Sequence, residues 1–188
     1  MARARKVWRR RQKSFDPARL IILDESGAKT NLSRLYGRAP RHERAIGRCP
    51  AGHWQTITMI SSIRLDGRTA CMALEGTTDT EAFRAYVRQV LVPTLRPGDI
   101  VVMDNLSPHK SDHTLKLMAE AGAEVLFLPA YSPDFNPIEM MWSKIKNFLR
   151  SLEARTVPDL ITAIGQALAR ITAKDALNWF AHCGYSFC

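Results

Sequence analysis

The chain has 188 residues, of which 46% are hydrophobic and 8% aromatic, and its formal net charge is +9 at pH 7. This length and composition suit one globular domain with a hydrophobic core, and they exclude a chain that is disordered throughout. No apolar run approaches the roughly 18 residues of a membrane-spanning helix, and the N-terminus lacks the apolar stretch of a secretion signal, so we expect a cytoplasmic protein with no membrane contact.

The positive charge is concentrated in two segments. Residues 1–13 contain seven arginines and lysines and no acid, which makes +7, and residues 27–53 contain six against Glu43, which makes +5. The rest of the chain therefore sums to −3. Two such segments are expected of a protein that lies along a polyanion, although a solvated tail and a solvated loop would give the same pattern.

The four cysteines do not have the spacing of a zinc site. They are Cys49, Cys71, Cys183 and Cys188. The pairs Cys49 with His53 and Cys183 with His182 each lack the second pair that would complete a tetrahedral site. We therefore expect reduced, structural thiols.

Three strand candidates precede the first helix. They are Leu20–Leu23, which ends at Asp24, and the pair Gln55–Ile63 and Thr69–Leu74. The last two are separated by Asp66-Gly67, which is a strong signal for a hairpin turn. The basic stretch from Ala28 to His53 has no sustained hydrophobic period. A loop of that length inside a compact domain is unusual and tends to be functional.

Short buried strands then alternate with helices. The strand candidates are Ile100–Met103 and Val125–Leu128, and helices are predicted to start at Thr78, Ser107, Asn136, Thr156 and Thr172. Each helix start carries a capping residue, followed by proline or by an acid three residues on. The order predicts an α/β fold in which helices flank a mixed sheet and further helices follow at the C-terminus.

Three carboxylates are candidates for a metal site. Asp24 and Asp104 each follow a buried strand, at the sheet edge where open α/β sheets bind ligands, and Glu139 lies in the first turn of the helix after the next strand. Three converging carboxylates repel one another unless cations lie between them. Oxygen ligands of this kind suit Mg²⁺ or Mn²⁺, and two such ions support phosphoryl transfer.

Each of these acids also has a purely structural explanation. Asp24 could cap the turn after its strand, and Asp104-Asn105 could form an ordinary strand-to-helix turn. Glu139 is three residues after Asn136, which is the position of a capping-box partner and a favourable place for an acid near a helix N-terminus. These explanations treat the acids one at a time and leave their recurrence at one sheet edge unexplained.

The strings around the acids resemble a known family. They are Asp24-Glu25-Ser26-Gly27, Met103-Asp104-Asn105-Leu106-Ser107-Pro108-His109 and Tyr131-Ser132-Pro133-Asp134-Phe135-Asn136-Pro137-Ile138-Glu139, followed by Trp142. Thirty-four residues separate Asp104 from Glu139. From about Trp8 to Tyr185, the chain resembles the catalytic domain of bacterial insertion-sequence transposases related to mariner elements, the DDE superfamily with a ribonuclease H-like fold.

This resemblance implies a reaction and the residues that perform it. The implied enzyme cleaves transposon ends with water and then joins the freed 3′-hydroxyl to target DNA, with Asp24, Asp104 and Glu139 holding two Mg²⁺ or Mn²⁺ ions. Relatives commonly have a histidine soon after the Asp-Asn pair, which His109 matches. We expect His109 to contact a DNA phosphate or to support a metal ligand, or else to be a solvent-facing helix residue. The implied domains are a basic segment, residues 1–16, and the catalytic domain, residues 17–188.

The resemblance also indicates partners and one departure. Relatives act on DNA, and we expect a homodimer on DNA. Full-length relatives have an N-terminal helix-turn-helix region that recognises the transposon end, and no stretch of this chain matches it. A fragment, a truncated copy, or one product of a split gene with a separate helix-turn-helix protein would each explain this. The long basic loop resembles the insertion that relatives use against a partner subunit or DNA.

One helix face is a candidate DNA contact. Glu139, Lys146 and Arg150 fall close to one stripe, with Lys144 nearby, so a basic ridge is predicted to lead from the metal site along the DNA backbone. A solvated basic face is the alternative. Trp142 has the periodicity of the core and is predicted to pack there.

Two other functions remain open from the sequence. One is a ribonuclease H-like nuclease that cuts DNA but does not join strands. The other is a non-catalytic DNA-binding remnant of a decayed element, which would bind DNA in a salt-sensitive way without nicking it.

Overall fold

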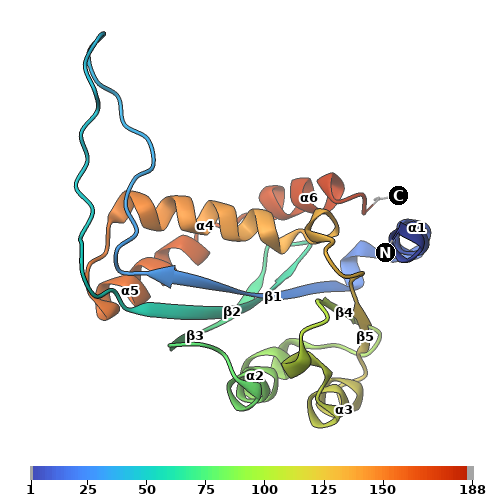
Figure 1. The fold of residues 1–188 in the computed structure, drawn as a ribbon. Coiled ribbons are helices and arrows are strands. Elements are labelled where there is room, and N and C mark those ends of the chain that lie inside the picture. Colours follow the sequence, from blue (N-terminus) through green and yellow to red (C-terminus); the bar gives the residue numbers. More distant parts are fainter. Residues whose placement is uncertain (1, 186–188) are drawn as a thin grey trace.

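Five strands form one sheet in the order β3-β2-β1-β4-β5 in the computed structural model, which describes residues 2–185 (Figure 1). The strands are β1 (Leu20–Lys29), β2 (Thr56–Arg64), β3 (Thr69–Glu75), β4 (Ile100–Met103) and β5 (Glu124–Phe127). The first three pair antiparallel, whereas β1, β4 and β5 are parallel. The predicted mixed sheet is therefore confirmed.

Helices cover both faces of this sheet. They are α1 (Ala2–Arg11), α2 (Thr80–Tyr86), α3 (Asp112–Glu120), α4 (Ile138–Leu152), α5 (Val157–Leu168) and α6 (Ala173–His182). In Figure 1, α4, α5 and α6 lie on one side of the sheet, and α2 and α3 lie on the other. No helix among the described residues is long and apolar enough to cross a membrane.

The sheet therefore separates two hydrophobic cores. Successive strand residues point to opposite faces, so Leu20 and Ile22 pack in the core with α4, α5 and α6, while Ile21 and Leu23 pack in the core with α2 and α3. Burial on both faces explains why β1 and β4 begin as continuous apolar runs. Trp142 is 2% exposed in the first core, as its periodicity predicted.

Strand β1 is longer than the sequence predicted. The apolar run ends at Leu23, but the strand continues to Lys29 because β2 pairs with it from Ile21 to Lys29. Asp24 consequently lies within β1, opposite Ser61, rather than at its end. Asp24 and Asp104 still lie close together because β4, which is shorter than β1, ends at Met103, just before Asp104.

The helix starts predicted at Thr78 and Ser107 differ from those in the structure. The N-cap of α2 is Asp79 rather than Thr78, and its carboxylate accepts from the Ala82 amide. Ser107 begins a short 3₁₀ turn, Ser107–Lys110, and the α-helix follows at Asp112. The caps at Thr156 and Thr172 are confirmed.

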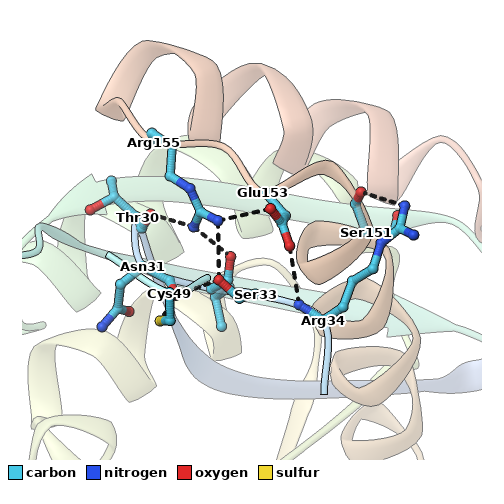
Figure 2. Close-up of polar contacts among 9 residues, drawn as sticks. Thr30, Asn31, Ser33, Arg34, Cys49, Ser151, Glu153 and Arg155 are labelled. Carbon is cyan, nitrogen blue, oxygen red and sulfur yellow. Dashed lines mark hydrogen bonds and ion pairs between the residues drawn. The ribbon is translucent and has the colours of Figure 1, made fainter. Parts of the chain in front are cut away.

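The basic loop between β1 and β2 projects from the domain as a two-legged arm (Figure 1). Its outer part, residues 35–53, is exposed throughout. The root is held by Arg155, whose guanidinium donates to the carbonyl oxygens of Thr30 (3.2 Å) and Leu32 (2.8 Å) and to Ser33 Oγ (3.0 Å), as Figure 2 shows in part. The arm therefore leaves the domain from a fixed base beside the end of α4.

The three cysteines among the described residues are free thiols. Cys49 is exposed, Cys71 is half-buried and Cys183 is buried, and none of the three forms a disulfide. Cys188 lies outside the described residues, as does the end of the predicted domain 17–188.

Candidate active site at the carboxyl end of the parallel strands

Asp24 and Asp104 are brought together by the parallel pairing of β1 with β4. The register aligns Ile22 with Val102, and two further residues along each strand give Asp24 and Asp104. Two residues is one full period of a strand, so both aspartates point to the same face as Ile22 and Val102. That is the face covered by α4.

Glu139 approaches the same place from α4. It is exposed in the first turn of the helix, and it lines one hollow of about 430 Å³ together with Asp24 and Asp104. Asn105 and Asn136 also line this hollow, as does the chain from Leu128 to Pro133. The three predicted carboxylates are thus gathered from three separate elements at one site.

The carboxylate of Asp24 is not neutralised by a basic side chain. It forms no ion pair with any lysine or arginine among the described residues, and it accepts from the Glu25 amide (2.8 Å) and from Asn136 Nδ2 (3.3 Å). Burial, with smaller contributions from the charges of Glu139 and Asp104, raises the pKa of Asp24 to about 7. A cation in the hollow would relieve this penalty.

The buried side chain of His109 contacts the Asp104 carboxylate. The Nδ1 atom of His109 lies 2.7 Å from Asp104 Oδ1, within ion-pair distance but outside good hydrogen-bond geometry, and Nε2 lies 3.4 Å from Glu25 Oε1. Burial alone would lower the pKa of His109, but these two acids outweigh it and raise the pKa to about 9. Burial likewise opposes ionisation of Asp104, yet contact with His109 leaves its pKa below the ordinary value.

The position of His109 corrects two of its predicted roles. Its side chain is fully buried and its ring lies 4.3 Å from that of Phe83, so it neither faces solvent nor offers a surface to a DNA phosphate in this conformation. Of the three roles considered, its contact with Asp104 favours support of a metal ligand.

Asn136 does not cap α4 as the sequence suggested. The residue before the helix is Pro137, and no side chain caps the first turn. The Asn136 amide instead donates to Asp24, and its Oδ1 atom is buried without a partner. Glu139 therefore has no capping-box partner, which removes one of its two structural explanations; its place in the first turn of α4 remains favourable for an acid. Sequence reasoning missed this role of Asn136, for which its place in the Ser-Pro-Asp-Phe-Asn-Pro string was the only signal.

The predicted basic ridge on α4 is only partly available. Lys144 Nζ donates to the Arg170 carbonyl oxygen (2.8 Å) and to Asp175 Oδ2 (2.5 Å), so the ammonium connects α4 to the start of α6. Its contact with DNA stays a prediction. Lys146 and Arg150 are half-buried, and Arg150 donates to Asn147. These two remain candidates for a phosphate contact.

The residues at the site have the chemistry of ligands for divalent metal ions, but their side chains are not arranged as a metal site. No group of three or more His, Cys, Asp or Glu side chains within residues 2–185 is arranged to hold a metal ion. The donors that line the hollow are nevertheless hard oxygens, which Mg²⁺ and Mn²⁺ prefer. The raised pKa of Asp24 and the unpartnered Oδ1 of Asn136 are the features that a bound cation with its water ligands would satisfy.

Residues 19–161, most of the chain, match the sequence profile of the DDE superfamily endonuclease domain. The chain belongs to this family. No curated protein sequence matches it.

Solved structures with a similar fold come from the Mos1 transposase. They are the Mos1 strand transfer complex (TM-score 0.73, 16% identity), the mariner Mos1 paired-end complex with Mg (0.69, 17%) and the Mos1 catalytic domain with Raltegravir and Mg (0.60, 15%). These matches cover 95%, 96% and 97% of this chain. The chain spans 56% of the Mos1 chains in the two complexes and 91% of the catalytic-domain chain. The predicted ribonuclease H-like fold is thereby confirmed.

Proposed function

We propose that this DDE domain is the catalytic domain of a transposase, which cleaves DNA at transposon ends and joins the 3′-hydroxyl to target DNA. The observation that carries the proposal is the gathering of Asp24, Asp104 and Glu139 around one hollow, with Asp24 half-buried and in no ion pair with a described lysine or arginine. Buried carboxylates with a raised pKa in a cleft are typical of catalytic sites.

Each acid has a distinct role in this proposal. Asp24, on the central strand, would be a ligand shared by two divalent ions, and Asp104 and Glu139 would be the other carboxylate ligands. When bound, Mg²⁺ or Mn²⁺ supplies activation of the attacking oxygen and stabilisation of the leaving oxygen. Partial burial raises the pKa of Asp24 to about 7, and a bound cation would favour its ionised form.

The residues around the acids prepare them for this role. His109 keeps Asp104 ionised and fixes its position, since its two ring nitrogens lie between Asp104 and Glu25. Asn136 orients the Asp24 carboxylate through its amide. Such supporting contacts set the geometry and affinity of a metal site.

The partners of the domain are part of the proposal. We propose that it acts as a homodimer on DNA and that a helix-turn-helix region, in the same or a separate chain, recognises the transposon end. The arm, with its basic residues, would lie against DNA or a second subunit.

The decisive experiment uses DNA ends of the element itself, read from the sequence that flanks the gene. The wild type is expected to nick these ends with Mg²⁺ or Mn²⁺, and pre-cut ends are expected to join to target DNA. Asp104→Ala and Glu139→Gln should fold normally, as judged by circular dichroism, and lose at least ~10³-fold in rate, because each removes several kcal/mol of metal-dependent stabilisation.

The other outcomes of this experiment point to different functions. Nicking without joined product would indicate a nuclease. Binding without nicking, even after addition of a helix-turn-helix protein encoded upstream, would indicate a non-catalytic remnant. Full activity of Glu139→Gln would show that the third ligand is wrong.

A further inference from the structure

Helix α1 is attached to the catalytic domain through one face. Trp8 and Gln12, one helical turn apart, are 5% and 4% exposed, and Gln12 Nε2 donates to the Cys183 carbonyl oxygen at 2.9 Å. The side chain of Trp8 packs in the core with Leu20 and Phe135. The basic N-terminal segment is therefore a docked helix rather than a solvated tail.

Arg5 fastens α1 to the chain that borders the catalytic hollow. Its guanidinium makes a two-pronged ion pair with Asp134 (2.9 and 2.7 Å) and donates to Ser132 Oγ at 2.8 Å. Arg5 and Arg9 also lie over the ring of Phe135, at 4.7 and 5.6 Å from its centroid. This segment leads directly to Asn136 and α4, so the position of α1 is coupled to the position of the active site.

A second hollow connects α1 to the active site. It measures about 680 Å³ and lies between Arg3, Val7 and Arg11 of α1 and the chain after β4 and β5. Asn105 and the segment Leu128–Ala130 line both this hollow and the catalytic one. A strand of DNA that enters the catalytic hollow and passes over Leu128–Ala130 therefore reaches α1.

The outer face of α1 carries unneutralised positive charge. Of its basic residues, Arg5 pairs with Asp134 and Arg11 pairs with Glu124. Arg3, Lys6, Arg10 and Lys13 are exposed, and no described acid forms an ion pair with them. Their spacing of three, four and three residues places them on one stripe, directly opposite Trp8 and Gln12.

The length of the stripe suits a nucleic-acid backbone. Ten residues at 1.5 Å each give about 15 Å between Arg3 and Lys13 if the short turn after α1 continues the helix. Phosphates advance by roughly 3.4 Å per nucleotide along one strand of DNA, so the stripe spans about four nucleotides.

We infer that this stripe binds the phosphate backbone of the DNA that flanks the scissile bond, and that Arg5 holds the stripe in register with the catalytic residues. The inference rests on the proposed function, because it takes DNA to be the substrate. Contacts of this kind position a duplex without reading its sequence. The stripe would therefore hold any flanking DNA, whichever protein region recognises the transposon end.

The test compares two variants that lose the same charge. One is the triple variant Arg3→Gln, Lys6→Gln, Arg10→Gln, and its matched control is Arg88→Gln, Arg96→Gln, Lys174→Gln, whose side chains are exposed on other elements and line neither of these two hollows. Binding of a fluorescein-labelled 30-base-pair duplex is measured by anisotropy at several KCl concentrations, in EDTA. The slope of log K against log salt should weaken by about 2 to 3 in the first variant, since each phosphate contact contributes roughly 0.9. The control should keep the wild-type slope.

A cross-link locates the contact. Val7 is 57% exposed and lines the hollow beside α1. A photo-reactive side chain at this position should cross-link to DNA within a few nucleotides of the nick that the enzyme makes, and Arg5→Gln should spread or abolish this pattern while Arg5→Lys retains part of it. Cross-links far from the nick would overturn the inference.

The remaining outcomes separate this inference from the proposed function. Equal slopes for the two triple variants, or a wild type that binds no duplex, would overturn the inference. A change in molecular mass by light scattering, with an unchanged slope, would identify α1 as a protein contact and overturn it as well. A chain that never nicks DNA but shows the predicted loss of slope would refute the proposed function and support the inference. A chain that nicks DNA, but whose first triple variant keeps the wild-type slope, would support the proposed function and refute the inference.

Discussion

Aspartates lie at both ends of the strand pair β1–β4, and among the described residues an arginine pairs with the one before β4 but with neither of those at the other end. Asp99 precedes the strand, is 1% exposed, and accepts from Arg64 Nη2 (2.6 Å) and from the Arg96 amide (2.7 Å). Asp104 follows the strand and lines a hollow together with Asp24. No described lysine or arginine forms an ion pair with Asp24. Burial disfavours charge at both ends, but the contact with Arg64 holds the pKa of Asp99 below its usual value, whereas that of Asp24 rises to about 7.

This difference favours the Asp24 end as the functional one and the Asp99 end as a structural one. A larger hollow, of about 840 Å³, lies at the Asp99 end, and both acids that line it, Asp66 and Asp99, are paired with arginines. The proposed active site is therefore not at this larger hollow. The balance of charge supports the smaller one, because an acid kept without a counter-charge costs stability and is typical of a functional site.

The largest effect on stability is expected from Asp99→Ala. The substitution leaves the Arg64 guanidinium, whose side chain is 11% exposed, without its partner, and the free energy of unfolding should fall by about 3 to 5 kcal/mol. Urea denaturation measures this. The control is Asp66→Ala, which removes an exposed pair with Arg68 and should cost less than about 1 kcal/mol. Equal losses would erase the contrast between buried and exposed pairs at this end.

At the other end, Asp24→Asn should stabilise the fold. The folded-state pKa of Asp24, about 7, lies above the ordinary value of 3.8, so the native wild type loses stability as pH rises through this window. In the absence of divalent cations, the variant should gain on the order of 2 to 4 kcal/mol over the wild type at pH 7.5 and nothing below about pH 4.

Asp104→Asn is the matched control for this gain. The pKa of Asp104 is lowered rather than raised, so its loss should not stabilise the protein at neutral pH. The comparison between the two ends fails if Asp24→Asn is no more stable than the wild type at pH 7.5.

His109→Gln should weaken metal binding at the proposed active site without abolishing activity. Loss of the contact with Asp104 is expected to raise the Mg²⁺ concentration for half-maximal nicking by about 10- to 100-fold. His113→Gln, at an exposed position on α3, is the control. A fall in melting temperature with an unchanged Mg²⁺ midpoint would mean that His109 serves only to pack against Phe83.

The smallest effect on stability is expected at Asp175, an acid on α6 that lies at neither end of β4. Asp175 completes the capping box of α6 and pairs with Lys144; burial opposes ionisation, but these contacts lower its pKa to about 2. Asp175→Asn should destabilise the protein by about 1 kcal/mol at neutral pH. Because the folded pKa is depressed, the difference should shrink as pH falls from about 4 towards 2. Asp159 accepts from the Thr156 hydroxyl at the start of α5 and has no lysine partner among the described residues, so Asp159→Asn should cost less stability.

Local sequence determined much of this protein. The apolar runs specified β4 and β5 to within one residue, and the caps at Thr156 and Thr172 specified the starts of α5 and α6. These features depend on residues that are near neighbours in the chain, so they can be read without the fold. The three carboxylates were identified in the same way, from their positions after strands and from the strings around them.

Only the tertiary structure decided how those carboxylates are held. The length of β1 depends on pairing with β2. The raised pKa of His109 depends in part on Glu25, 84 residues away, and the position of α1 depends on Asp134, 129 residues from Arg5. No local pattern encodes these contacts, because each joins side chains whose partner is set by the packing of distant segments. The sequence could therefore indicate which acids meet, while the packing alone assigns which of them remains without a counter-charge.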